Sequence, residues 1–339
     1  MKKSNLLFLA SALLIMLALA VSSCTKEGPA GADGTDGVNG TDGTDGVDGN
    51  VVCMTCHNLE NKATKEMQYA QSGHAAGAVV GYAGGRQNCA RCHSNEGFIE
   101  TQFTGMDTTA AEIPIPTPIG CVTCHDFHDT FDFENEGPDY ALRTTKPVDL
   151  IMYDGEVTLD FGGPSNLCAT CHQPRTASPE DDGSGNFTIT STYWGSHHGP
   201  QSTSIEGIGG YEVGTGYPTP GSTTHKTEVT CIGCHMHEST GHTWNVDVAA
   251  CTSCHSDATD FNINGVQTDV QNMMAELKTK FIAAGMWDET EDKIVPGTYP
   301  IDHVGAYYNY AWILDDRSDG VHNAAYIKTL LTNSIAVFN

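Results

Sequence analysis

Positive charge is scarce in this chain. Its 339 residues include 16 lysines and arginines against 42 aspartates and glutamates, so the formal net charge is −26. A field of this sign repels the phosphates of nucleic acids and anionic lipid headgroups, and it favours encounters with positively charged partners. We therefore expect no nucleic-acid partner, and an anionic substrate is disfavoured. Acidity of this kind also keeps an exported protein soluble.

Long apolar runs are equally scarce, and the one that stands out is at the N-terminus. Lys2 and Lys3 precede an almost unbroken apolar stretch, residues 6–21, which ends at Val21-Ser22-Ser23-Cys24. The run is short for a bilayer span. The segment resembles a bacterial lipoprotein signal peptide, residues 1–23, with cleavage before Cys24 and lipid on its thiol. The alternative is an ordinary secretory signal cut nearby. Both predict export, and the lipid predicts a membrane-anchored lipoprotein facing the periplasm or the cell surface, as on an outer membrane.

Proline is nearly missing from the next segment, residues 24–50. Glycine recurs at every third position from Gly28 to Gly49, as in collagen, yet Pro29 is the single imino acid and five aspartates lie between the glycines. So little proline and so much negative charge disfavour a triple helix. We interpret the segment as a flexible acidic tether rather than a trimerising stalk. Fully extended, the 22 residues from Gly28 to Gly49 would span roughly 70 Å.

The sequence also lacks spare thiols. Of its 13 cysteines, all but Cys24 fall in six copies of Cys-x-x-Cys-His, so none is left for a structural disulfide. The six copies are Cys53-Met-Thr-Cys56-His57, Cys89-Ala-Arg-Cys92-His93, Cys121-Val-Thr-Cys124-His125, Cys168-Ala-Thr-Cys171-His172, Cys231-Ile-Gly-Cys234-His235 and Cys251-Thr-Ser-Cys254-His255.

This motif is the attachment signature of c-type haem. Two thiols one helical turn apart can add to the two vinyl groups of one porphyrin, and the adjacent histidine is the proximal iron ligand. A zinc half-site, a redox dithiol or a disulfide would not require the histidine. With 15 histidines in the chain, its presence after all six pairs has a chance probability on the order of 10⁻⁸. The sequence predicts six haem c groups.

Nine histidines remain after the six proximal ones are assigned. An iron that only carries electrons takes a second axial nitrogen, so all nine are candidates for the six distal positions. They are His74, His128, His197, His198, His225, His237, His242, His303 and His322.

The contexts of several of these histidines resemble those in multihaem c-type cytochromes. Ser72-Gly73-His74 and Ser196-His197-His198 resemble the family's Ser-x-His distal motif, and Cys124-His125-Asp126-Phe127-His128 its CxxCH-x-x-H form. Gly241-His242-Thr243-Trp244 is similar to its Gly-His-Thr-Phe element.

Two further likenesses complete the resemblance, which extends from about residue 51 to the C-terminus. His225 precedes Cys231 by a common ligand offset, and the segment around Gly320-Val321-His322-Asn323 is similar to the ending of several multihaem cytochromes and nitrite-reductase-like proteins. The resemblance implies the distal set His74, His128, His198, His225, His242 and His322, with His197 and His237 as substitutes.

Regular structure is predicted in four places of the domain at residues 51–339. Residues 148–153 and 156–161, joined by Asp154-Gly155, predict a β-hairpin. Apolar residues at helical spacing predict a helix over 267–284, and further helices are expected over 303–315 and 323–337. The fold class is mostly α with extensive irregular chain and one β-hairpin. The resemblance implies a haem-centred core.

The predicted function is electron transfer, in anaerobic respiration or to extracellular acceptors, with other redox proteins as partners. An iron with histidine on both faces has no open site, so an enzyme activity is less expected than a carrier. The alternatives are a reductase of small nitrogen or sulfur oxyanions and a subunit of a conductive cytochrome filament. The CxxCK motif often found at the catalytic haem of nitrite reductases is missing here.

Overall fold

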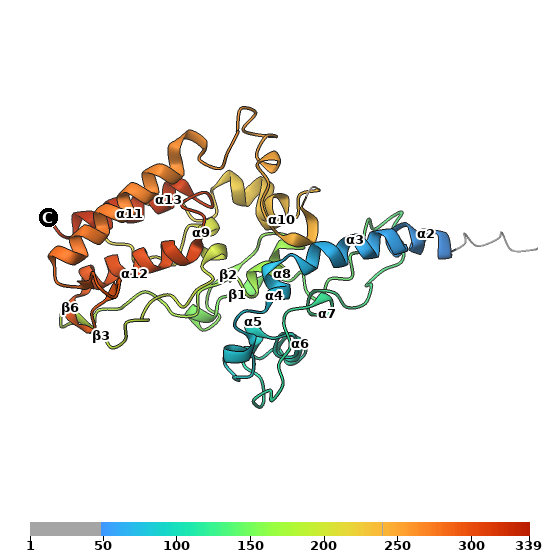
Figure 1. Cartoon of the computed structure of the whole chain (residues 1–339), viewed down its shortest axis with the longest axis horizontal. Helices are drawn as coiled ribbons and strands as arrows, with labels where there is room; N and C mark the ends of the chain where they lie inside the picture. The colour runs from blue at the N-terminus through green and yellow to red at the C-terminus, as the bar shows by residue number, and fades with distance from the viewer. Residues whose placement is uncertain (1–48, 239) are drawn as a thin grey trace, which may run out of the picture. The chain divides into compact units, whose positions relative to one another are not determined.

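The computed structural model describes residues 49–238 and 240–339 and divides the chain into two compact units, residues 1–55 and 56–339 (Figure 1). The described part of the first unit, residues 49–55, belongs to helix α2 (Gly49–Cys56). The predicted signal peptide, Cys24 and nearly all of the tether lie outside the described residues. Within the described ranges, no helix has the length and apolarity needed to cross a membrane.

The second unit is mainly helical, with long irregular connections, which confirms the expected class. Its α-helices are α3 (Leu59–Ala70), α4 (Gly73–Ala76), α5 (Ala90–His93), α6 (Asn95–Thr104), α7 (Cys121–Cys124), α8 (Ser165–Ala169), α9 (Gln201–Glu206), α10 (Thr230–His235), α11 (Val266–Ala283), α12 (Ile301–Asp316) and α13 (Ala324–Ala336). Short π and 3-10 turns occur at η1 (Val80–Gly84), η2 (Ile151–Tyr153), η3 (His225–Val229), η4 (Gly241–Thr243), η5 (Val248–Ala250) and η6 (Ile263–Gly265).

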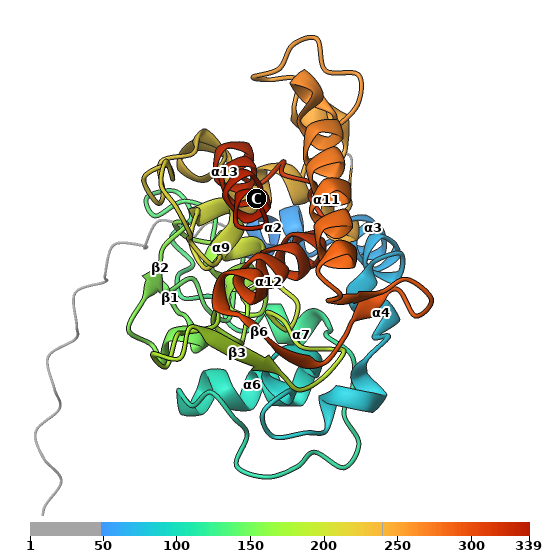
Figure 2. The same cartoon turned by 90° about the vertical axis from the view of Figure 1, so that its left-hand side faces the viewer.

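Three two-stranded antiparallel sheets are present in the described ranges. The predicted hairpin exists but is shorter: β1 (Val148–Asp149) pairs with β2 (Thr158–Leu159), and the chain between them winds into η2. Asp154 and Gly155 both have positive φ, as the turn prediction required. The sequence did not predict the pairing of β3 (Asn186–Ile189) with β6 (Gly297–Pro300), which Figure 2 shows beside α12, or that of β4 (Trp287–Asp288) with β5 (Lys293–Ile294).

The three C-terminal helices build the larger apolar core. Both α11 and α12 pack on α13 (Figures 1 and 2). Helix α11 buries one stripe, Val270, Met274, Leu277 and Phe281, whereas α12 is buried nearly all round and therefore lies inside the cluster. The sequence predicted these helices to within two residues at each end.

The N-terminal third of the second unit has few buried apolar side chains. In residues 56–147, all of which are described, the buried hydrophobic residues are Ala83, Ala90, Phe98 and Ala141. Several large apolar side chains there are open instead, among them Leu59 at 84% exposure, Phe103 at 91% and Phe127 at 85%. Most of the large apolar side chains that are exposed in the described residues lie in this part of the chain.

Candidate functional site

Each of the six motifs forms one tight helical turn. Four of the turns lie in or at the end of α2, α5, α7 and α10, the fourth motif begins in α8 and continues past its end, and the sixth follows η5. In four of them the histidine backbone N–H donates to the carbonyl of the first cysteine, which places both cysteines and the histidine on the same turn. These bonds are His93 to Cys89 at 3.2 Å, His125 to Cys121 at 2.9 Å, His172 to Cys168 at 3.0 Å and His255 to Cys251 at 2.8 Å.

Five motif histidines face a second histidine at nearly the same separation. The ring centroids are 6.0 Å apart in His57–His128, 6.1 Å in His125–His242, 6.1 Å in His172–His74, 6.4 Å in His235–His322 and 6.4 Å in His255–His225.

This separation fits an ion held between two imidazoles. Metal–imidazole bonds of about 2 Å, plus roughly 1 Å from each nitrogen to its ring centre, place two axial rings about 6 Å apart. Aromatic rings in plain contact also lie in this range. The distinguishing fact is that every pair joins one motif histidine to one member of the predicted distal set, across long distances in the sequence.

The remaining motif histidine, His93, lies near two of the four unpaired candidates, His197 and His198. Burial lowers its pKa first, and His198 and the cation of Arg175 lower it further. His93 likewise contributes to lowering the pKa of His197, after burial, Arg175 and His198. The two candidate rings are 5.5 Å apart, and both residues have positive φ. The structure thus brings His93 to the Ser196-His197-His198 motif without choosing between the two side chains.

Backbone carbonyls fix the orientation of three paired histidines. The Nδ1 of His125 lies 2.8 Å from the carbonyl oxygen of Tyr140, that of His235 lies 2.9 Å from Trp244, and that of His225 lies 2.7 Å from Val321. A carbonyl only accepts, so Nδ1 must carry the proton and Nε2 keeps its lone pair for a metal. This arrangement is typical of histidines that ligate metals.

The other paired histidines have different surroundings. Nδ1 of His172 lies 3.3 Å from the amide oxygen of Gln201, whereas Nδ1 of His242 is buried without a hydrogen-bond partner among the described residues. Nδ1 of His128 lies 3.6 Å from a carboxylate oxygen of Asp139, beyond hydrogen-bond distance. Asp315 and Asp316 accept from His198 and His322.

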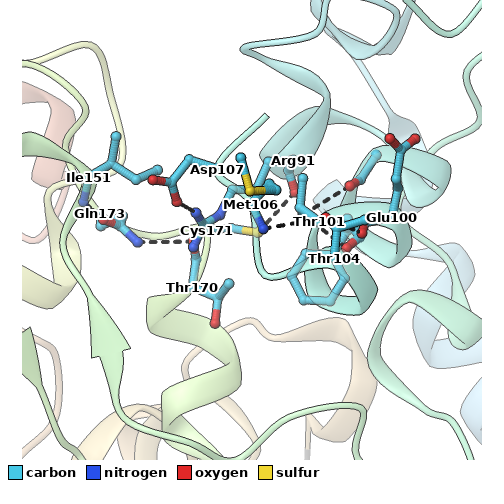
Figure 3. A network of polar contacts seen from close by, with 12 residues as sticks. Arg91, Glu100, Thr101, Thr104, Met106, Asp107, Ile151, Thr170, Cys171 and Gln173 are labelled. Carbon is cyan, nitrogen blue, oxygen red and sulfur yellow. Dashed lines mark hydrogen bonds and ion pairs between the residues drawn. The ribbon is translucent and has the colours of Figure 1, made fainter. Parts of the chain in front are cut away.

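Neighbouring motifs contact one another through their cysteines. The Cys92 thiol has a lowered pKa because of Cys171, whose sulfur also lies 3.8 Å from the Arg91 carbonyl. Figure 3 shows this junction, where the Arg91 side chain pairs with Asp107.

The fourth motif has further neighbours besides the second. Cys168 lowers the pKa of Cys231 to about 7. Burial raises the pKa of Cys234, and Cys251 of the last motif raises it further. The pKa of Cys168 is raised, first by Cys231 and then by burial, with a smaller contribution from Cys124 of the third motif. The fourth motif therefore lies next to the second, third and fifth, and the fifth next to the sixth.

Trp244 is a site residue whose role the sequence did not indicate. Its ring centroid lies 4.7 Å from that of His74 and 5.5 Å from that of His242, and its carbonyl accepts from His235. The sequence singled out Trp244 only as part of a distal motif. One residue thus contacts histidines from three different pairs.

Two candidate histidines take no part in the ring pairs described above. His303 stacks on Phe338 at 4.1 Å, beside the C-terminal core. His237, a substitute in the predicted set, lines a hollow of about 500 Å³ together with Cys254, Gly233 and Ser253. The twelve motif cysteines, the six motif histidines and the histidines of the distal set stay predicted haem and iron ligands. The separation of the five ring pairs fits that role, and the tautomer fits it at His125, His225 and His235.

No family model and no curated protein matches the sequence. Among solved structures, the chain is similar to the outer cell wall cytochrome OcwA, with a TM-score of 0.54 and 22% sequence identity. The alignment covers 81% of this chain and 50% of that one, so this chain corresponds to about half of that cytochrome. At this identity the likeness concerns the fold, so most of this chain has a fold that is found in a cytochrome.

Proposed function

We propose that the protein is an electron-transfer cytochrome with six covalently attached haem c groups, each iron held between two histidines. The observation that carries the proposal is the set of five histidine pairs at 6.0 to 6.4 Å, each with one histidine directly after a Cys-x-x-Cys pair. The fold shared with a cytochrome and the open apolar side chains of residues 56–147 support it.

The chain's own residues would do three things. The paired cysteines anchor each porphyrin by thioether bonds, and the paired histidines close both faces of the iron to outside molecules. Backbone carbonyls such as those of Tyr140 and Val321 hold the imidazoles in the tautomer that ligates. The bound haem supplies an iron that cycles between Fe(III) and Fe(II). With both faces closed, electron transfer is favoured over catalysis at an open iron.

The arrangement of motifs supports a relay. The fourth motif (Cys168, Cys171) has the second, third and fifth motifs as neighbours, and the sixth follows the fifth. His128, the partner of the first motif's His57, is three residues from His125 of the third. We propose a path that runs through motifs one, three, four, five and six, with the second as a branch at the fourth.

The proposed location and partners rest on the sequence. The apolar N-terminus ending at Val21-Ser22-Ser23-Cys24 supports export and a lipid anchor, with the protein facing the periplasm or the cell surface. The acidic charge of −26 supports a partner with a positive docking surface, either another redox protein or an extracellular acceptor. Replacing Cys24 by serine should release the protein from the membrane fraction without changing its haem content.

A direct test is to purify the protein from a host that attaches c-type haem. We expect six haems per chain by pyridine haemochromogen assay and a ferric paramagnetic resonance spectrum with low-spin signals alone. The reduced protein should bind no carbon monoxide. A purified protein without haem would refute the proposal, and a high-spin signal with one carbon monoxide per chain would instead indicate a reductase.

A further inference from the structure

Helix α12 ends in two consecutive aspartates, and each contacts a different predicted distal ligand. One carboxylate oxygen of Asp315 lies 3.0 Å from Nδ1 of His198, and the other accepts from the His198 backbone N–H at 3.1 Å. Asp316 lies 2.7 Å from Nδ1 of His322 and also accepts from the Ser318 hydroxyl. The end of one helix therefore reaches a predicted distal ligand near His93 and the histidine paired with His235.

The same helix end is tied to another histidine pair through Gln201. The side-chain amide of Gln201 donates to the backbone carbonyl of Asp315 at 2.9 Å, and its oxygen faces Nδ1 of His172 at 3.3 Å. His172 belongs to the fourth motif, which lies between the second and the fifth. At the second, fourth and fifth motifs in turn, the group facing Nδ1 is the carboxylate of Asp315, the neutral amide of Gln201 and the carboxylate of Asp316.

The charge of the group that accepts from Nδ1 matters because it changes how strongly the imidazole donates electrons to the iron. A carboxylate that accepts from Nδ1–H makes the imidazole a stronger electron donor through Nε2, and its negative charge favours Fe(III) over Fe(II). A backbone carbonyl or an amide does this less, since it carries no net charge.

Burial makes the two aspartates unequal. The Asp316 side chain is fully buried, whereas that of Asp315 is 25% exposed. Arg175 also lies near His93, and its positive charge opposes Asp315. Because solvent and an opposite charge both weaken an electrostatic effect, Asp316 should act more strongly than Asp315.

We propose that Asp315 and Asp316 lower the reduction potentials of the irons at His198 and His322, below that of the iron at His74 and His172 between them. The inference rests on the proposed function. Electrons that enter these three haems one at a time would then reside mainly on the iron at His74 and His172, because its potential is the highest of the three.

The test is a potentiometric titration of the full haem-loaded protein carrying Asp316→Asn, followed by visible absorbance. One of the six haems should titrate at a higher potential, with at least a tenfold change in its ratio of reduced to oxidised iron at a fixed potential, which is about 59 mV for one electron. Asp315→Asn should shift a different haem in the same direction by about threefold.

The matched control is Asp319→Asn, three residues beyond Asp316 in the same connection, where the carboxylate accepts from Gln271 instead of a histidine. It should leave all six potentials unchanged. Haem content and low-spin signals are measured in every variant, so a loss of haem or ligation is seen separately. If Asp316→Asn does not fold, Asp315→Asn carries the test. Six low-spin haems with unmoved or lowered potentials would overturn the inference and leave the proposed function intact.

Discussion

Replacing His322 by alanine removes the ring that lies 6.4 Å from His235 and leaves the Cys-x-x-Cys attachment untouched. One of six irons should lose its sixth ligand and become high-spin, and the reduced variant should bind one carbon monoxide per chain. The buried Asp316 loses its partner at 2.7 Å, which should lower the free energy of unfolding by about 1.5–3 kcal/mol, as for a hydrogen bond to a charged group.

The assay combines three measurements on the purified variant. Haemochromogen absorbance should still give six haems, paramagnetic resonance should show the high-spin signal, and added imidazole should restore the low-spin state. His303→Ala is the control, because His303 stacks on Phe338 instead of facing a motif histidine. A His322→Ala protein whose irons all stay low-spin would remove this residue from the ligand set.

Three further predictions concern the C-terminal core. Trp312→Ala should lower the free energy of unfolding in urea by about 3–5 kcal/mol because the indole is fully buried. Trp312→Phe should lower it less because the indole N–H has no partner among the described residues. Equal losses in the two variants would contradict this. Gly305→Ala should destabilise by about 1–3 kcal/mol, since an added Cβ would lie 2.0 Å from the Tyr211 ring, and an unchanged urea midpoint would show that the ring can move. Burial raises the pKa of Tyr307 to about 12, so its stabilising contribution is complete below about pH 10 and is lost as the pH rises toward 12. Circular dichroism should show a smaller alkaline loss of stability for Tyr307→Phe than for the wild type, and parallel curves would refute this assignment.

The helices at the C-terminus were predictable because their signal is local. Apolar spacing in residues 266–283 and the composition of the two helices that follow specify both their type and, within two residues, their ends. The pairing of Asn186–Ile189 with Gly297–Pro300 had no such signal, because a two-stranded ladder between distant segments depends on tertiary packing. The predicted hairpin was too long, because residues 151–153, predicted as strand, form a 3-10 turn in which Met152 is buried.

The same distinction between local signals and tertiary packing applies to the candidate site. Each of the six motifs is a run of five consecutive residues, so the sequence shows every one of them completely. The resemblance to multihaem cytochromes implies the distal set, which stays a prediction. The sequence could not show that His242 lies beside His125 or His74 beside His172, because only the fold brings these residues together. Asp316 and Gln201 carry no motif of their own, and their part in the site follows from the position where helix α12 ends.

Trp244 contacts histidines that belong to three different pairs. Its indole contacts His74 and His242 while its carbonyl accepts from His235, and a φ of 55° fixes the backbone at that point. A change in the volume of its side chain reaches His74 and His242, and a change in its backbone reaches His235 as well, so substitutions around it should have non-additive effects. This part of the protein is best engineered as a single unit.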